Sequence, residues 1–203
     1  MYALYVTHPQ VRMDPAVPVP RWSLSEEGFA RARRFAQHPL VKAVRRIVAS
    51  DETKAIVLAQ AMSVTTGAPF TTDAEFGEND RSSTGYVPAD RLERLADAFF
   101  AHPNASVEGW EPAAAAQARI VGAFEAALQF HGTTSPIAFA GHGAVGTLLK
   151  CALDGRVISR DEDQRRMIGN PGGGNVLVIR LRDRALLSDW AAMEELPEVI
   201  AGL

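Results

Sequence analysis

Short apolar runs alternate with helical patterns along this 203-residue chain, and that alternation limits the possible folds more than any other feature. Residues 2–7, 46–49, 136–140 and 175–181 read as buried strands because they are short and rich in aliphatic and aromatic side chains. Apolar positions at helical spacing predict helices at 25–36, 51–62, 90–100, 112–130 and 143–153. Strands that alternate with helices predict an α/β fold of three layers, α/β/α, with a mostly parallel central sheet.

The length and the lack of a long linker favour one domain over residues 1–203. Residues 70–72 and 185–190 are weaker strand candidates, the second at an edge of the sheet and followed by a short C-terminal helix. From residue 75 the sequence becomes polar and contains glycine. We expect a lid or specificity excursion around 75–112, because loops on a rigid scaffold commonly decide what is bound.

Charge and composition exclude several function classes. The formal charge of −3, from 24 acidic and 21 basic side chains, argues against a nucleic-acid partner, which requires a basic face. No apolar run approaches the roughly 18 residues of a membrane span, so no membrane partner is expected. Cys151 is the single cysteine and cannot form an intrachain disulfide, which favours a reducing, cytoplasmic location.

Two of the five histidines lie at the ends of predicted strands. His8 comes after the strand at 2–7, and His142 comes after the strand at 136–140. Ligands of parallel α/β sheets bind beyond the carboxyl ends of the strands, so both imidazoles are expected at the binding edge. Imidazole is a common base and nucleophile near neutral pH, and the pair therefore indicates a catalytic site rather than two core residues.

The segment Gly141–Gly146 matches the pattern G-x-G-x-x-G of dinucleotide sites. Such a site also needs an acidic residue at the end of the next apolar strand, whereas Asp161–Asp163 lies in a charged run. Too little chain remains after residue 146 for the rest of such a sheet. We interpret these glycines instead as allowing an anion to approach the N-terminus of the helix that begins at Gly143.

Six segments, in order, match motifs of one known family: Tyr5–Pro9, Trp22–Gly28, Ala49–Ala55, Phe76–Glu78 with the following Gly85, Gly141–Gly143, and Asn170 before the last long strand. Together they resemble the histidine phosphatase superfamily, also called phosphoglycerate mutase-like, over most of the chain. Thr-His-Pro here takes the place of the family's Arg-His-Gly motif. The resemblance implies the phosphoglycerate mutase-like form of the α/β/α fold.

The resemblance also implies roles for individual residues. His8 would be the nucleophile that carries a phosphohistidine intermediate. His142, with amides at the helix start near Gly143, would stabilise the phosphoryl oxygens, and Lys54 would neutralise their charge. Glu78 would protonate the leaving group, and Glu75 is the alternative because the loop register is uncertain by a few residues.

Three departures from the family pattern weaken the expected anion site. Thr7 and Lys54 stand where the family has arginines, and Pro9 replaces a glycine and removes a backbone N–H. Lysine is a point charge and cannot reproduce the two-pronged fork of arginine. Arg12 and Arg81 are the candidates to restore the positive charge, with an ordinary surface role as the alternative for both.

The leading hypothesis is a phosphatase that acts on a small phosphomonoester without a metal or an organic cofactor. The alternative is a catalytically impaired protein of the same fold that binds inorganic phosphate or another anion, and a mutase ranks third. The sequence identifies no substrate. It leaves the oligomeric state open, with a homodimer as one candidate.

Overall fold

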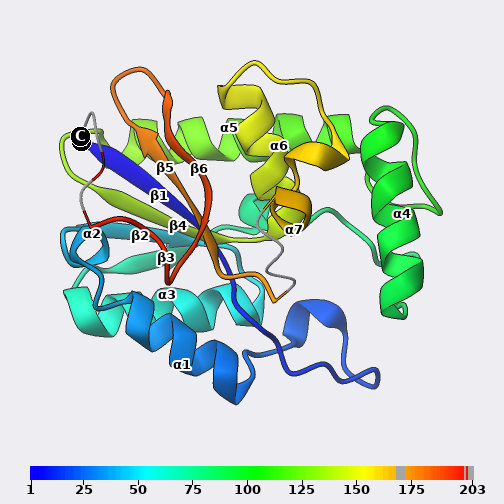
Figure 1. Cartoon of the computed structure of the whole chain (residues 1–203), viewed down its shortest axis with the longest axis horizontal. Coiled ribbons are helices and arrows are strands. Elements are labelled where there is room, and N and C mark those ends of the chain that lie inside the picture. Colours follow the sequence, from blue (N-terminus) through cyan, green and yellow to red (C-terminus); the bar gives the residue numbers. More distant parts are fainter. Residues whose placement is uncertain (168–171, 199, 201–203) are drawn as a thin grey trace.

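The computed structural model describes residues 1–167, 172–198 and 200, and it confirms the α/β class (Figure 1). Its sheet has six strands in the order β3-β2-β4-β1-β5-β6. The bounds are β1 (Tyr2–Thr7), β2 (Arg46–Ala49), β3 (Phe70–Thr72), β4 (Ile137–Gly141), β5 (Asn175–Arg180) and β6 (Leu186–Ala192). All the predicted strands are present, although several differ by one or two residues at their ends.

The sheet is mostly parallel, as predicted. β1 pairs with β4 in parallel, β4 with β2, and β2 with β3. β5 runs antiparallel to β1, and β6 runs antiparallel to β5 at the edge. The parallel strands therefore direct their carboxyl ends to the same end of the sheet. There β1 continues into His8, and β4 continues into His142.

Helices cover both faces of the sheet and complete the three layers (Figure 1). The α1–α3 side packs on the strand residues whose side chains point one way, such as Leu4 and Val6. The α4–α6 side packs on the alternate set, such as Tyr5 and Phe139. The helices are α1 (Glu26–Phe35), α2 (Pro39–Lys42), α3 (Thr53–Thr66), α4 (Ala89–Ala101), α5 (Ala113–His131), α6 (Gly143–Leu153) and α7 (Gln164–Met167), with 3-10 turns η1 (Val19–Arg21), η2 (Ala74–Phe76) and η3 (Arg160–Glu162).

The predicted start of α1 is confirmed, because the Ser25 hydroxyl accepts from the Gly28 amide. Two other helix predictions, for α3 and for the C-terminal segment, need correction. α3, however, is preceded by Glu52, whose side chain makes no capping bond, and it extends to Thr66 because Gly67 first supplies the left-handed conformation, φ 70°, that ends it. Residues 193–198 form turns and a bend instead of the predicted short helix.

None of the helices in the described part of the chain is both long and apolar enough to cross a membrane. Asn170, part of the predicted closing motif, lies outside the described residues.

Candidate active site

The sheet register brings His8 and His142 together. Thr7 on β1 pairs with Gly141 on β4, so the two histidines follow paired positions. The His8 amide donates to the Gly141 carbonyl at 3.0 Å, and the imidazole centroids lie 5.3 Å apart, edge to face. The backbone pairing of two central strands thus fixes the spacing of the imidazoles.

His8 is held in one tautomer. Its Nδ1 lies 2.9 Å from the Pro9 carbonyl oxygen, which can only accept, so Nδ1 carries the hydrogen and Nε2 keeps its lone pair. Burial, and next the positive charge of Lys54, lower the His8 pKa to about 4. The imidazole is therefore neutral near pH 7. Pro9 lacks an N–H, as the sequence indicates, but its carbonyl orients the neighbouring ring.

His142 is fully buried at the start of α6. The Tyr5 hydroxyl accepts from the His142 amide and donates to its carbonyl, at 3.2 Å each, and so anchors its backbone. A Cβ at Gly141 or Gly146 would clash with the Tyr5 ring, which explains both glycines. Burial lowers the His142 pKa to about 3, with nearby Glu52 acting in the opposite direction. Within the described residues neither imidazole nitrogen of His142 has a hydrogen-bond partner.

Glu52 is a member of the site that the sequence reasoning missed. Its Oε1 lies 3.3 Å from His142 Nε2 and accepts from the Glu78 amide at 2.9 Å. Its Oε2 pairs with the ammonium of buried Lys54, which also donates to the Val19 carbonyl at 3.0 Å. Burial alone would raise the Glu52 pKa, but His142 and Lys54 lower it to about 2. The only sequence signal was an acid two residues before Lys54.

Glu78 is tied to the N-terminus of α6. Its carboxylate accepts from the amides of Ala144 at 3.2 Å and Val145 at 3.0 Å, where the helix dipole favours negative charge. Arg81 lies 3.6 Å from the same carboxylate and stacks over the Trp110 ring at 5.3 Å. Glu75, the alternative proton donor, is exposed. The structure thus brings Glu78, and not Glu75, to the first turn of the helix that follows His142.

The two α6 amides that an anion was expected to use hold Glu78 instead. The group that lies close to Gly143 is the side-chain amide of Gln164 and not an anion. A Cβ at residue 143 would clash with Gln164 Nε2, which explains the glycine. Thr7, in the place of a family arginine, donates to Gln164 Oε1 at 2.9 Å and accepts from the Asn175 amide at 2.9 Å. A neutral hydrogen-bond network therefore fills the position where the family pattern has a cation.

The two arginines considered as replacements lie in different places. Arg81 is at the site through its contact with Glu78. Arg12 is exposed, and its backbone amide donates to the Ser23 carbonyl at 2.9 Å. No ion pair of the Arg12 side chain is found with residues 1–167 or 172–198.

Arg119 on α5 fixes the loop that carries Glu78, and it is a second residue that the sequence reasoning missed. Its guanidinium donates to the backbone carbonyls of Glu75 at 2.7 Å, Gly77 at 3.1 Å and Glu78 at 3.3 Å. The same guanidinium forms two bonds with the Glu111 carboxylate, at 3.0 and 2.8 Å. Arg119 therefore positions the Glu78 segment without pointing a charge at the histidines.

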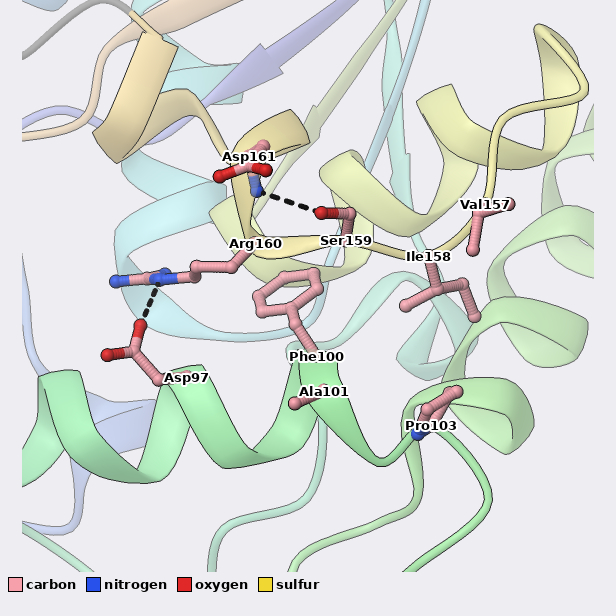
Figure 2. Close-up of a pocket in the computed structure, with 9 residues that line it drawn as sticks. All are labelled: Asp97, Phe100, Ala101, Pro103, Val157, Ile158, Ser159, Arg160 and Asp161. Atoms are coloured by element: carbon pink, nitrogen blue, oxygen red, sulfur yellow. Dashed lines mark hydrogen bonds and ion pairs between the residues drawn. The ribbon is translucent and has the colours of Figure 1, made fainter.

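A separate pocket of about 320 Å³ lies between the end of α4 and the segment around η3 (Figure 2). Phe100 and Arg160 line it, and Arg160 bonds Asp97 across its rim at 3.0 Å. The pocket includes neither His8 nor His142 and so is distinct from the candidate site.

A mostly parallel sheet that joins two histidines at neighbouring strand ends is typical of phosphoglycerate mutase-like histidine phosphatases. The family model of the histidine phosphatase superfamily (branch 1) matches residues 14–182. The chain belongs to this superfamily. The matched region begins at residue 14, so it does not include Thr7-His8-Pro9, the segment that resembles the family's first histidine motif.

Solved structures share the fold at low sequence identity. A mycobacterial glucosyl-3-phosphoglycerate phosphatase in complex with inorganic phosphate is 17% identical, with a TM-score of 0.75, over 96% of this chain and 99% of that one. The same enzyme in complex with VO3 is 18% identical, with a TM-score of 0.70, over 94% and 96%. YhfR of Bacillus stearothermophilus is 16% identical, with a TM-score of 0.71, over 97% and 98%. Among curated proteins, none matches this sequence significantly.

Proposed function

We propose that this protein is a phosphatase that hydrolyses a small phosphomonoester through a phosphohistidine intermediate on His8. The observation that carries the proposal is the state of His8. Its Nδ1 is held by the Pro9 carbonyl, its pKa is lowered to about 4, and His142 lies beside it. A neutral imidazole with a fixed tautomer presents Nε2 as a nucleophile. A structural relative that was solved in complex with inorganic phosphate supports a phosphate-binding role for a protein of this fold.

The reaction then takes two steps. In the first, His8 Nε2 forms a bond to phosphorus, the ester P–O bond breaks, and protonated Glu78 gives its proton to the leaving alkoxide. In the second, water attacks phosphorus, Glu78 takes a proton from that water, and the P–N bond breaks. The products are an alcohol and inorganic phosphate, and His8 and Glu78 return to their starting states.

Polar groups around His8 would stabilise the transferred phosphoryl group. The neutral imidazole of His142 and the ammonium of Lys54 lie on either side of Glu52, and Arg81 lies on the loop side, where its guanidinium stacks over the Trp110 ring. Fixed donors aimed at developing charge are the main source of such stabilisation. We assign substrate choice to the excursion around 75–112, which contributes both Glu78 and Arg81.

The test is hydrolysis of an aryl phosphate by the wild type, by His8→Asn, and by His102→Asn as a control at an exposed histidine. Loss of the nucleophile should lower kcat by at least about 10⁴-fold, and the control should match the wild type. Rapid quenching should trap an acid-labile phosphoryl group on the wild type and not on His8→Asn. Equal activity of His8→Asn and wild type would rule out the mechanism.

One observation favours a second candidate, a phosphate-binding protein with impaired catalysis. The ammonium of Lys54 is already paired with Glu52, and Thr7 brings no charge, so the site has fewer free cations than the family pattern. Calorimetric binding of phosphate without turnover of any aryl or alkyl phosphate would favour this candidate. Trapping of a phosphohistidine would exclude it.

A further inference from the structure

Glu52 places a carboxylate among the groups that would receive a phosphoryl oxygen. One oxygen lies 3.3 Å from His142 Nε2, and the other pairs with Lys54. In the proposed function, both His142 and Lys54 stabilise the transferred phosphoryl group. A ligand that reaches His142 and Lys54 must therefore also meet Glu52.

Each cation at the site already faces an acidic side chain before any ligand arrives. Lys54 pairs with Glu52, and Arg81 lies 3.6 Å from the Glu78 carboxyl group. The pKa values of about 4 for His8 and about 3 for His142 leave the imidazoles uncharged at neutral pH. A fully ionised phosphoryl group would thus meet a Glu52 carboxylate whose partner cation, Lys54, is already paired with it, and like charges at close range repel.

A phosphoryl oxygen that carries a hydrogen would meet Glu52 differently. An ionised carboxylate only accepts hydrogen bonds, and an O–H donor to a carboxylate forms one of the stronger kinds of hydrogen bond. Among the residues that the structure describes, the Glu78 amide and Lys54 donate to the two oxygens of Glu52. A single P–OH group would therefore form a hydrogen bond with Glu52, where an ionised phosphoryl oxygen would be repelled.

Resting on the proposed function, we propose that Glu52 is a specificity-determining residue that accepts a hydrogen bond from a protonated phosphoryl oxygen. The site would thus take the singly protonated form of a phosphomonoester in preference to the dianion. The second ionisation of such an ester has a pKa of about 6, so the protonated form is a minor but usable species at neutral pH. No proton is transferred to Glu52 on binding.

Phosphate and sulfate provide a matched pair of probes. At a pH of about 8 both are mainly dianions of similar shape, but phosphate keeps one proton and sulfate has none. Calorimetry would measure both affinities for the wild type, Glu52→Gln, and Asp51→Asn, a control that removes an exposed carboxylate one residue away. Glu52→Leu is a second neutral variant in case the amide disturbs folding, which a thermal melt would detect.

The wild type and Asp51→Asn should bind phosphate at least about tenfold more tightly than sulfate, a ratio equivalent to about 1.4 kcal/mol. The ratio should fall to about 2 or less in Glu52→Gln or Glu52→Leu, mainly through tighter sulfate binding. Equal binding of the two anions by the wild type, binding of neither, or an unchanged ratio in both neutral variants would overturn the proposal.

This experiment is independent of turnover. If no variant hydrolyses any ester but the anion ratio collapses in the neutral variants, the selective role of Glu52 stands and the phosphatase proposal fails. If the wild type hydrolyses esters through His8 while the ratio is unchanged by Glu52→Gln, the phosphatase proposal stands and the role of Glu52 is wrong.

Discussion

The two halves of the site are held in different ways. His8 and His142 follow paired residues of two central strands, and backbone hydrogen bonds of the sheet set their spacing. Glu78 and Arg81 belong to a loop: Arg119 and amides of α6 bind Glu78, and Arg81 contacts Glu78 and the Trp110 ring. We refer to these as the strand-end half and the loop half.

The difference indicates which half can adjust. Moving a strand-end histidine requires breaking the register of a buried sheet, whereas moving Glu78 requires only the release of a few hydrogen bonds on a partly exposed segment. The strand-end half is therefore suited to the invariant step at phosphorus. The loop half is suited to the leaving group, which differs between substrates.

The strand-end half should make the fold sensitive to acid. His142 stays neutral in the folded chain down to a pH of about 3, whereas in the unfolded chain it takes up a proton below about 6.5. A lowered folded pKa means that stability is complete above pH 6.5 and is lost as the pH falls toward the folded value. Between pH 7 and 4 the wild type should lose on the order of 3 kcal/mol more than His142→Gln.

Urea unfolding at both pH values measures that difference. His102→Gln, which removes an exposed histidine, should follow the wild type. Parallel losses in the wild type and His142→Gln would show that His142 does not stay neutral in the folded chain, and the sensitivity to acid could then not be assigned to the strand-end half.

The loop half should affect substrates unequally. Glu78→Gln removes the proton donor, so hydrolysis of an alkyl phosphate should slow by about 100-fold. An ester of an acidic phenol needs no proton on departure and should be hydrolysed at nearly the wild-type rate. Glu75→Gln is the matched control three residues away and should leave both rates unchanged. The reverse pattern, with Glu75→Gln selective and Glu78→Gln silent, would reassign the proton donor.

The strand-end half was predictable because the positions of its two histidines follow from local sequence patterns. Strand runs that end at His8 and His142 can be read directly, and parallel strands place such ends at one edge. Glu78 was predictable only through the resemblance, and the choice against Glu75 needed the contact with the α6 amides. The antiparallel direction of β5 had no signal of its own in the run 175–181.

Glu52 and Arg119 escaped prediction for a common physical reason. Glu52 lies beside Lys54 in sequence, but its importance comes from His142, which a different strand delivers. Arg119 lies on α5, more than 40 residues from the carbonyls it binds. An arginine on an amphipathic helix is normally a solvated side chain, but here α5 packs against η2, next to the loop that Arg119 binds.

Arg119→Lys should therefore produce a weaker form of the Glu78 defect. An ammonium cannot bind three carbonyls and a carboxylate at once as the planar guanidinium does, so the loop should loosen while its charge is kept. We expect hydrolysis of the alkyl phosphate to slow by about tenfold and that of the aryl phosphate to change little. Arg184→Lys is the control, because Arg184 forms a similar paired contact with Glu125 on the same helix.

The double variant Glu78→Gln with Arg119→Lys tests whether Arg119 acts through Glu78. If it does, the double variant should be no slower than Glu78→Gln alone, because a loop without its proton donor gains nothing from being positioned. Multiplied losses, or an Arg119→Lys defect equal for aryl and alkyl esters, would show that Arg119 supports the whole site. The two halves would then be held by one framework, and the sheet register alone would not explain the stability of the strand-end half.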